Sequence, residues 1–210
     1  MTNITQTSPA PIGHNGPPGH VEPTTTIRLV APIATEQGEI THLTLRDPTL
    51  GELVQSDDHP GMLGSVQIIA AAANIKPDTA RRLKTRDTIA ASRWFDSLVP
   101  PAPPPALDDD GEPKAVDIEG GERTFDLLGP VEIGGKVVTQ ITLREPDVEV
   151  GIAIEKVKGA HRQTARMIAV LSGRTVPEVL KLRRRDVMVI ERWLIPFVTD
   201  TPSKGAGGAT

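Results

Sequence analysis

One six-residue segment occurs twice in this chain, and the repeat limits the fold more than any other feature. Residues 43–48 read LTLRDP, and residues 141–146 read ITLREP. In both segments apolar and polar side chains alternate, which predicts a strand with one buried face, and a charge pair followed by proline ends it. The sequence therefore predicts two copies of one small unit.

Matching residues continue beyond these segments. Early in the unit they are 98 positions apart, as in Pro32/Pro130 and Pro48/Pro146, and in the last helix they are 99 apart, as in Asp87/Asp186 and Trp94/Trp193. One residue inserted between the hairpin and the last helix of the second copy accounts for the change. We interpret the pattern as an internal duplication.

Each copy should begin with a β-hairpin, with strands at 27–32 and 40–45 and again at 124–130 and 137–144. Proline should end the first strand of each hairpin because it lacks an N–H group for the ladder. The side chains expected to face the helices are Leu43, Leu45, Ile141 and Leu143, with the threonines between them in solvent. The residues expected to fix the turn from sheet to helix are Arg46, Asp47 and Pro48, and in the second copy Arg144, Glu145 and Pro146.

About three helices should pack on each hairpin, so the predicted fold class is α+β. In the first copy Thr49 and Glu52 have the spacing of a capping box, and the nearly all-apolar segment 62–73 should be a buried helix. Thr85 should cap the last helix, with Asp87 at its positive end.

The last helices should be anchored in their cores by tryptophan, Trp94 in the first copy and Trp193 in the second. In the second copy Asp186 matches Asp87, and Pro196 should end or kink the helix near Ile195.

Composition divides the chain into five parts. We expect disordered tails at 1–25 and 199–210, folded units at 26–99 and 124–198, and a Pro-rich acidic linker at 100–123. The net charge of −4 is unevenly distributed along the chain. The linker has 2 basic and 7 acidic residues, whereas the second unit has 12 basic and 9 acidic residues. Units this small are marginally stable alone, so contact with the other copy or with a partner is expected.

Several classes of chemistry are not encoded. The chain has no Cys, no phosphate-binding glycine loop and no nucleophile elbow. His14 and His20 lie in a predicted tail, and three adjacent loop residues, Asp57, Asp58 and His59, rarely converge on one ion. We therefore predict a protein that is not an enzyme and has no cofactor or metal site. The N-terminal region lacks the features of a signal peptide, and no apolar run is long enough to span a membrane.

A basic segment of the second copy leaves a DNA-binding interpretation open. Residues 161–186 can be read as a helix-turn-helix with basic side chains for phosphate contacts. Two observations argue against DNA binding. The first copy has the same predicted order of elements but more acidic than basic residues, and only 2% of residues in the chain are aromatic. Arg183, Arg184 and Arg185 would suit an acidic protein partner as well, and we take them as the candidate partner-binding residues.

The order of these motifs resembles one family. A hairpin ending in LTLR-x-P, a short helix starting TLGEL, an apolar helix closing with Ser-Gly and an Arg-Asp pair before the last helix are similar to the small tail assembly chaperones of tailed bacteriophages. The likeness covers 26–99 and again 124–198. Members of that family are commonly single units, so the tandem arrangement departs from its pattern.

The resemblance implies a non-catalytic protein of the host cytoplasm that binds the tape-measure protein, and with it tail tube proteins, during tube assembly. A client helix would lie in an apolar groove, and two linked copies would gain from effective concentration. Self-association is compatible with such a role. A minor structural protein of the tail is a further alternative, which differs in remaining in the finished virion.

Overall fold

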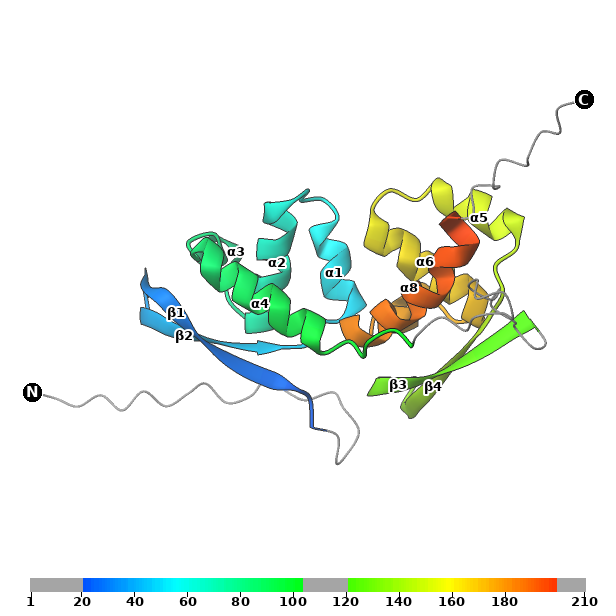
Figure 1. Cartoon of the computed structure of the whole chain (residues 1–210), viewed down its shortest axis with the longest axis horizontal. Coiled ribbons are helices and arrows are strands. Elements are labelled where there is room, and N and C mark those ends of the chain that lie inside the picture. Colours follow the sequence, from blue (N-terminus) through cyan, green and yellow to red (C-terminus); the bar gives the residue numbers. More distant parts are fainter. Residues whose placement is uncertain (1–20, 104–120, 200–210) are drawn as a thin grey trace, which may run out of the picture.

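The computed structural model describes residues 21–103 and 121–199, which form two similar α+β units (Figure 1). The first copy consists of β1 (Thr24–Thr35), β2 (Gly38–Arg46), α1 (Leu50–Ser56), α2 (Met62–Ala73), α3 (Pro77–Ala80) and α4 (Thr85–Ser97). The second copy consists of β3 (Glu122–Ile133), β4 (Lys136–Arg144), α5 (Val148–Glu155), α6 (Ala160–Ser172), α7 (Val176–Val179) and α8 (Arg184–Thr199). The predicted fold class is confirmed: each copy is a hairpin packed on helices. Most of the predicted tails and linker lies outside the described residues.

Each hairpin is a two-stranded antiparallel sheet with the same break in its register. In the first copy, pairing stops after Arg28 and resumes at Ile33, and the second copy has the matching irregularity. The prediction that proline ends the first strands was wrong, because β1 and β3 continue past Pro32 and Pro130. These prolines lie in the unpaired segment, where no ladder hydrogen bond is needed.

An aspartate of the last helix holds the unpaired segment of the strand in each copy. The Asp87 carboxylate accepts a hydrogen bond from the Val30 N–H group (3.0 Å). Asp186 accepts hydrogen bonds from the N–H groups of Leu128 (2.6 Å) and Gly129 (3.2 Å). Both aspartates are buried, so they satisfy N–H groups in a segment where the ladder is interrupted.

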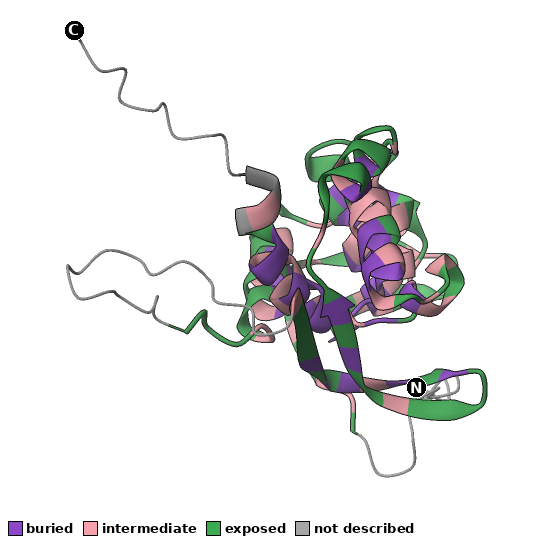
Figure 2. Cartoon of the chain, turned by 90° about the vertical axis from the view of Figure 1, so that its right-hand side faces the viewer, coloured by how far each residue is buried: buried purple, intermediate pink, exposed green. Residues whose placement is uncertain are grey.

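The repeated six-residue segments bury alternate side chains, as predicted (Figure 2). The four buried residues are Leu43, Leu45, Ile141 and Leu143, each at most 4% exposed. The exposed threonines between them bond across their hairpins, Thr44 to Thr26 (3.3 Å) and Thr142 to Thr124 (2.8 Å). One face of each hairpin therefore covers the core, and the other faces water.

The caps of the first two helices agree with the sequence. Thr49 and Glu52 form the capping box of α1, and α2 ends at Asn74 in the left-handed conformation (φ 53°). The N-caps of α1 and α5, Thr49 and Asp147, are 98 residues apart, whereas the C-caps of α2 and α6, Asn74 and Gly173, are 99 apart. The additional residue of the second copy therefore lies in the α5–α6 segment.

The last helices differ from prediction in two details. Thr85 is the first residue of α4, and Lys84 rather than Thr85 holds the N-cap position. The sequence predicts that α8 ends or kinks near Ile195; the helix does not end there, because it continues through Pro196 to Thr199. Trp193 is buried and Trp94 half-buried, in keeping with their expected role as anchors of the last helices.

Candidate functional site

The two copies meet along α1, a helix of the first copy that packs against α6 and α8 of the second as well as against its own α2 (Figure 1). Leu50 and Leu53 are 0% and 2% exposed, and they belong to the hydrophobic core of the second copy. We call this region the inter-copy contact: residues 47–58 of the first copy against 159–162 and 180–185 of the second. The two copies share one core there.

Backbone hydrogen bonds also cross the inter-copy contact. The pairs are Leu50 N–H to Leu182 O (2.8 Å), Gly51 N–H to Leu180 O (2.9 Å) and Arg184 N–H to Pro48 O (2.8 Å). A helix start has N–H groups without partners in the helix, and here the other copy supplies the acceptors. The chain segments on the two sides therefore have a fixed alignment.

Asp57 caps a helix of the other copy. Its carboxylate accepts hydrogen bonds from the backbone N–H groups of His161 (3.1 Å) and Arg162 (2.9 Å) at the start of α6, and it contacts the His161 ring (2.8 Å). Asp58 pairs with both terminal nitrogens of the Arg162 guanidinium. Gly159 has a φ of 96°, and a Cβ on it would collide with Asp57. The acidic loop Asp57–Asp58 thus fastens α1 to α6.

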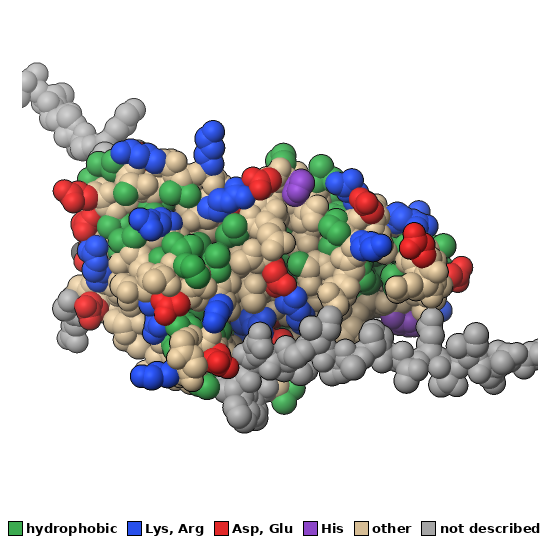
Figure 3. Space-filling model, turned by 180° about the vertical axis from the view of Figure 1, so that it is seen from behind, with side chains coloured by type: hydrophobic (Ala, Val, Ile, Leu, Met, Phe, Trp, Pro, Cys, Tyr) green, Lys and Arg blue, Asp and Glu red, His purple; other side chains and the backbone are tan. Residues whose placement is uncertain are grey.

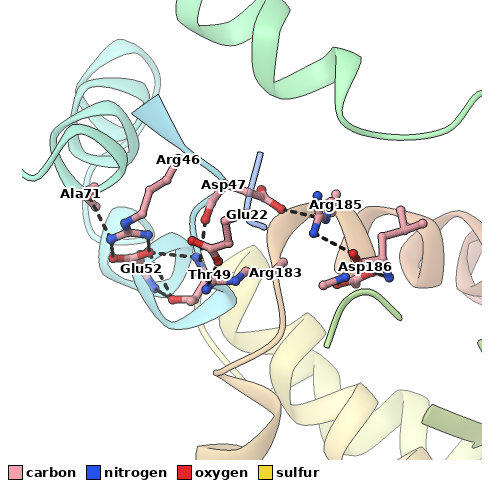
Figure 4. A network of polar contacts seen from close by, with 11 residues as sticks. Glu22, Arg46, Asp47, Thr49, Glu52, Ala71, Arg183, Arg185 and Asp186 are labelled. Atoms are coloured by element: carbon pink, nitrogen blue, oxygen red, sulfur yellow. Dashed lines mark hydrogen bonds and ion pairs between the residues drawn. The ribbon is translucent and has the colours of Figure 1, made fainter. Parts of the chain in front are cut away.

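The three candidate partner-binding arginines lie within the inter-copy contact, where Figure 4 shows Arg183 and Arg185. Their acidic partners are Glu22 for Arg183, Asp96 for Arg184 (2.8 Å) and Asp47 for Arg185 (3.4 Å). Their side chains are only 16%, 16% and 9% exposed. They bind the second copy to the first and present little surface to anything else.

Burial changes the protonation of two carboxyl groups beside these arginines. Burial raises the pKa of Asp47 to about 6, although the Arg185 charge opposes the shift. Burial likewise raises the pKa of Asp186 to about 6, against the N–H groups of Leu128 and Gly129 that favour its charged form. The charge inside the contact therefore changes near pH 6.

A half-buried ion pair bridges the first two helices of the first copy. Arg46, at the end of β2, forms a bidentate ion pair with the Glu52 carboxylate of α1. It also donates a hydrogen bond to the Ala71 carbonyl of α2 (3.1 Å) (Figure 4). The pKa of Arg46 is raised chiefly by this hydrogen bond to Glu52. Arg46 thus connects the end of β2 to α1 and to α2.

The second copy lacks this bridge and has a groove between α5 and α6. Val150 stands where Glu52 stands in the first copy, so Arg144 pairs with Asp147 (3.0 Å) instead. The groove encloses about 210 Å³. Its apolar lining consists of Val150, Ala153, Ile154 and Val170, and its rim of Arg144, Asp147, Glu149 and Arg166. Figure 3 shows apolar side chains interspersed with charges of both signs on the rear face of the molecule.

No family model, curated protein or solved structure matches the chain. Among residues 21–103 and 121–199, no helix is long and apolar enough to cross a membrane. Within the same residues, His, Asp and Glu side chains do not gather in threes as a metal ion would require.

Sequence reasoning placed the frame of each copy and expected contact with the other copy or with a partner, but it did not identify the residues of the inter-copy contact. Leu50, Leu53 and Asp57 had no assigned role, because the residues they contact lie far along the chain, in the second copy. One signal was available: the acidic loop at 57–58 and the basic pair at 161–162 are complementary in charge. The groove depends on one exchange, Glu52 for Val150, which alignment of the two copies reveals.

Proposed function

We propose that the protein is a phage tail assembly chaperone that binds amphipathic helical segments of a tape-measure protein and keeps them soluble while the tail tube assembles. The chaperone would act without catalysis in the cytoplasm of the bacterial host. The motif order of both copies supports the family, and the α5–α6 groove of the second copy is the observation that supports helix binding.

The groove suits an amphipathic helix because its lining and rim differ in chemistry. Val150, Ala153 and Val170 offer apolar surface, while Arg144 and Glu149 place both charges at the edge. A client helix would bury its apolar stripe on the lining and pair its flanking charges with the rim. In the first copy, the Arg46–Glu52 pair occupies the corresponding position.

The matched copies allow a specific test. Ala153 is exposed at the groove, and its counterpart in the first copy is Gln55, also exposed. The full chain, Ala153→Arg and Gln55→Arg would each be co-expressed with a candidate tape-measure protein. We expect a soluble complex on gel filtration for the unaltered chain and for Gln55→Arg, and its loss for Ala153→Arg.

Three outcomes would contradict the proposal in different ways. An insoluble client with every variant would reject the chaperone function. A complex that survives Ala153→Arg but not Gln55→Arg would move the site to the first copy. Detection of the protein in purified virions would favour the structural tail protein instead.

DNA binding receives less support, because Arg183, Arg184 and Arg185 are used within the chain. That alternative predicts duplex affinity that falls steeply with salt. We expect no such binding near physiological salt.

A further inference from the structure

The rim of the α5–α6 groove carries two opposite charges, one on each helix. Glu149 belongs to the first turn of α5, and Arg166 lies in the middle of α6. Both residues are exposed, and within the described part of the chain neither side chain forms a hydrogen bond or an ion pair. The other two rim charges, Arg144 and Asp147, pair with each other (3.0 Å). Glu149 and Arg166 are therefore the rim charges that a bound molecule can pair with.

The two helices that form the groove run in opposite directions. In the first copy, Arg46 contacts Glu52 near the start of α1 and the Ala71 carbonyl near the end of α2, so the start of one helix lies beside the end of the next. The helices α5 and α6 are the counterparts of this pair, and the connection between them is equally short. The start of α5 therefore lies beside the end of α6.

The opposite charges lie diagonally across the groove. Residues four apart share a helix face, so Glu149 and Ala153 line one wall, and Arg166 and Val170 line the other. Because the helices are antiparallel, Glu149 lies across from Val170, and Arg166 lies across from Ala153. An acid therefore stands on the α5 wall at one end and a base on the α6 wall at the other, about one helical turn apart along the groove.

The first copy, where the groove is closed, has neither of these charges. The residues that correspond to Glu149 and Arg166 are Gly51 and Gln67. In that copy an ion pair fills the position of the groove. Both rim charges thus occur in the copy whose groove is open.

The floor of the groove differs between the copies in the matching way. Three positions are more apolar in the second copy, namely Val150 for Glu52, Ile154 for Ser56 and Val170 for Ala71. An apolar floor alone would bind any apolar helix face. Charges of opposite sign on the two walls add a requirement for what lies beside that face.

From this arrangement we infer that the groove selects client helices whose apolar stripe has a basic residue along one side and an acidic residue along the other. The basic residue pairs with Glu149, and the acidic residue pairs with Arg166 about one turn further along. A helix with like charges on both sides places one of them against a like charge, which weakens binding. The inference rests on the proposed function of the groove and adds which client helices it accepts.

Three synthetic helical peptides with one common apolar stripe would test this selection. A mixed peptide has Lys along one side of the stripe and Glu along the other, and two uniform peptides have only Lys or only Glu on both sides. Fluorescence anisotropy at low salt would measure their binding to the full chain. We expect the Kd of each uniform peptide to be about threefold to tenfold higher than that of the mixed peptide, and high salt should reduce the difference.

Charge reversals in the full chain should change the preferred peptide. Arg166→Glu makes both unpaired rim charges acidic and should favour the Lys peptide, whereas Glu149→Lys makes both basic and should favour the Glu peptide. The double variant restores opposite charges, so the mixed peptide should again bind best. Gln67→Glu, at the position of the first copy that corresponds to Arg166, is the matched control and should keep the preference of the unaltered chain. Thermal unfolding should show that all these variants are folded.

The possible failures of the inference and of the proposed function differ in this experiment. If the three peptides bind equally well, or a uniform peptide binds best, and Ala153→Arg abolishes binding, the groove is a client site but the charge selection is wrong. If no peptide binds, or if binding survives Ala153→Arg, the groove is not the client site, and the inference falls with it.

Discussion

Asp47 of the first copy and Arg185 of the second bury opposite charges together, with Asp47 Oδ2 3.4 Å from Arg185 Nε. Asp47 is 0% exposed and Arg185 7%. Asp47 directly precedes residues 48–51, and Arg185 directly follows residues 180–184. Backbone hydrogen bonds join these two segments across the inter-copy contact. Because an unpaired charge in this position would be costly, the pair makes the fold of one copy depend on the presence of the other.

The first prediction concerns pH. The folded-state pKa of Asp47, about 6, is above the unfolded value, so the folded state binds the proton more tightly. The stabilisation is therefore present below the unfolded pKa and is lost as pH rises through about 6. Between about pH 5 and about pH 7.5 the unaltered chain should lose on the order of 1 kcal/mol from this group.

Urea unfolding of the unaltered chain and of Asp47→Asn at these two pH values would measure the effect. At pH 5 Asp47 is mostly protonated, so asparagine resembles it in charge and the two proteins should be close in stability. As pH rises, the variant should lose less stability than the unaltered chain. Asp186 supplies a similar dependence in both proteins, so only the difference between them counts. An identical pH dependence in the two proteins would show that Asp47 is charged throughout.

The second prediction concerns Asp57. Asp57→Ala removes the acceptor for two N–H groups at the start of α6 and should lower the free energy of unfolding by about 1–2 kcal/mol. Asp58→Ala is the matched control, because its ion pair with Arg162 is exposed and screened by water. Thermal unfolding should show a clearly larger loss for Asp57→Ala. Equal effects would mean that the cap contributes no more than a surface ion pair.

The third prediction compares two equivalent residues in different surroundings. Leu50→Ala leaves a cavity in the core that the copies share, and it should cost about 2–5 kcal/mol. Val148→Ala, at the matching position of the second copy, should change stability by no more than about 0.5 kcal/mol, since its side chain is 79% exposed. Denaturant unfolding of both variants at the same protein concentration gives both values.

These predictions distinguish structural features that form within one copy from features that depend on contact between the two copies. The hairpins, the burial of Leu43 and Leu45 and the capping box of α1 follow from local alternation and spacing, and the sequence predicts them. The packing of Leu50 in the core of the other copy does not follow from such patterns. It depends on how two folded surfaces fit, and an apolar residue near a helix start serves either core equally well. The same holds for Arg183–Arg185, whose charges suggested an external partner.

The last prediction isolates the close approach of Asp57 to Gly159. Gly159→Ala must accommodate a positive φ of 96° and a Cβ that collides with Asp57, whereas Gly135→Ala meets a positive φ of 75° with open space around it. Both should be destabilising, by about 1 kcal/mol or more from backbone strain, and Gly159→Ala should lose additional stability from the collision. A double-mutant cycle separates the two causes: in the Asp57→Gly background all three colliding atoms, Oδ2, Cγ and Cβ, are gone, so the cost of Gly159→Ala should fall toward that of Gly135→Ala. Strictly additive effects would place Asp57 too far from Gly159 for the contact described.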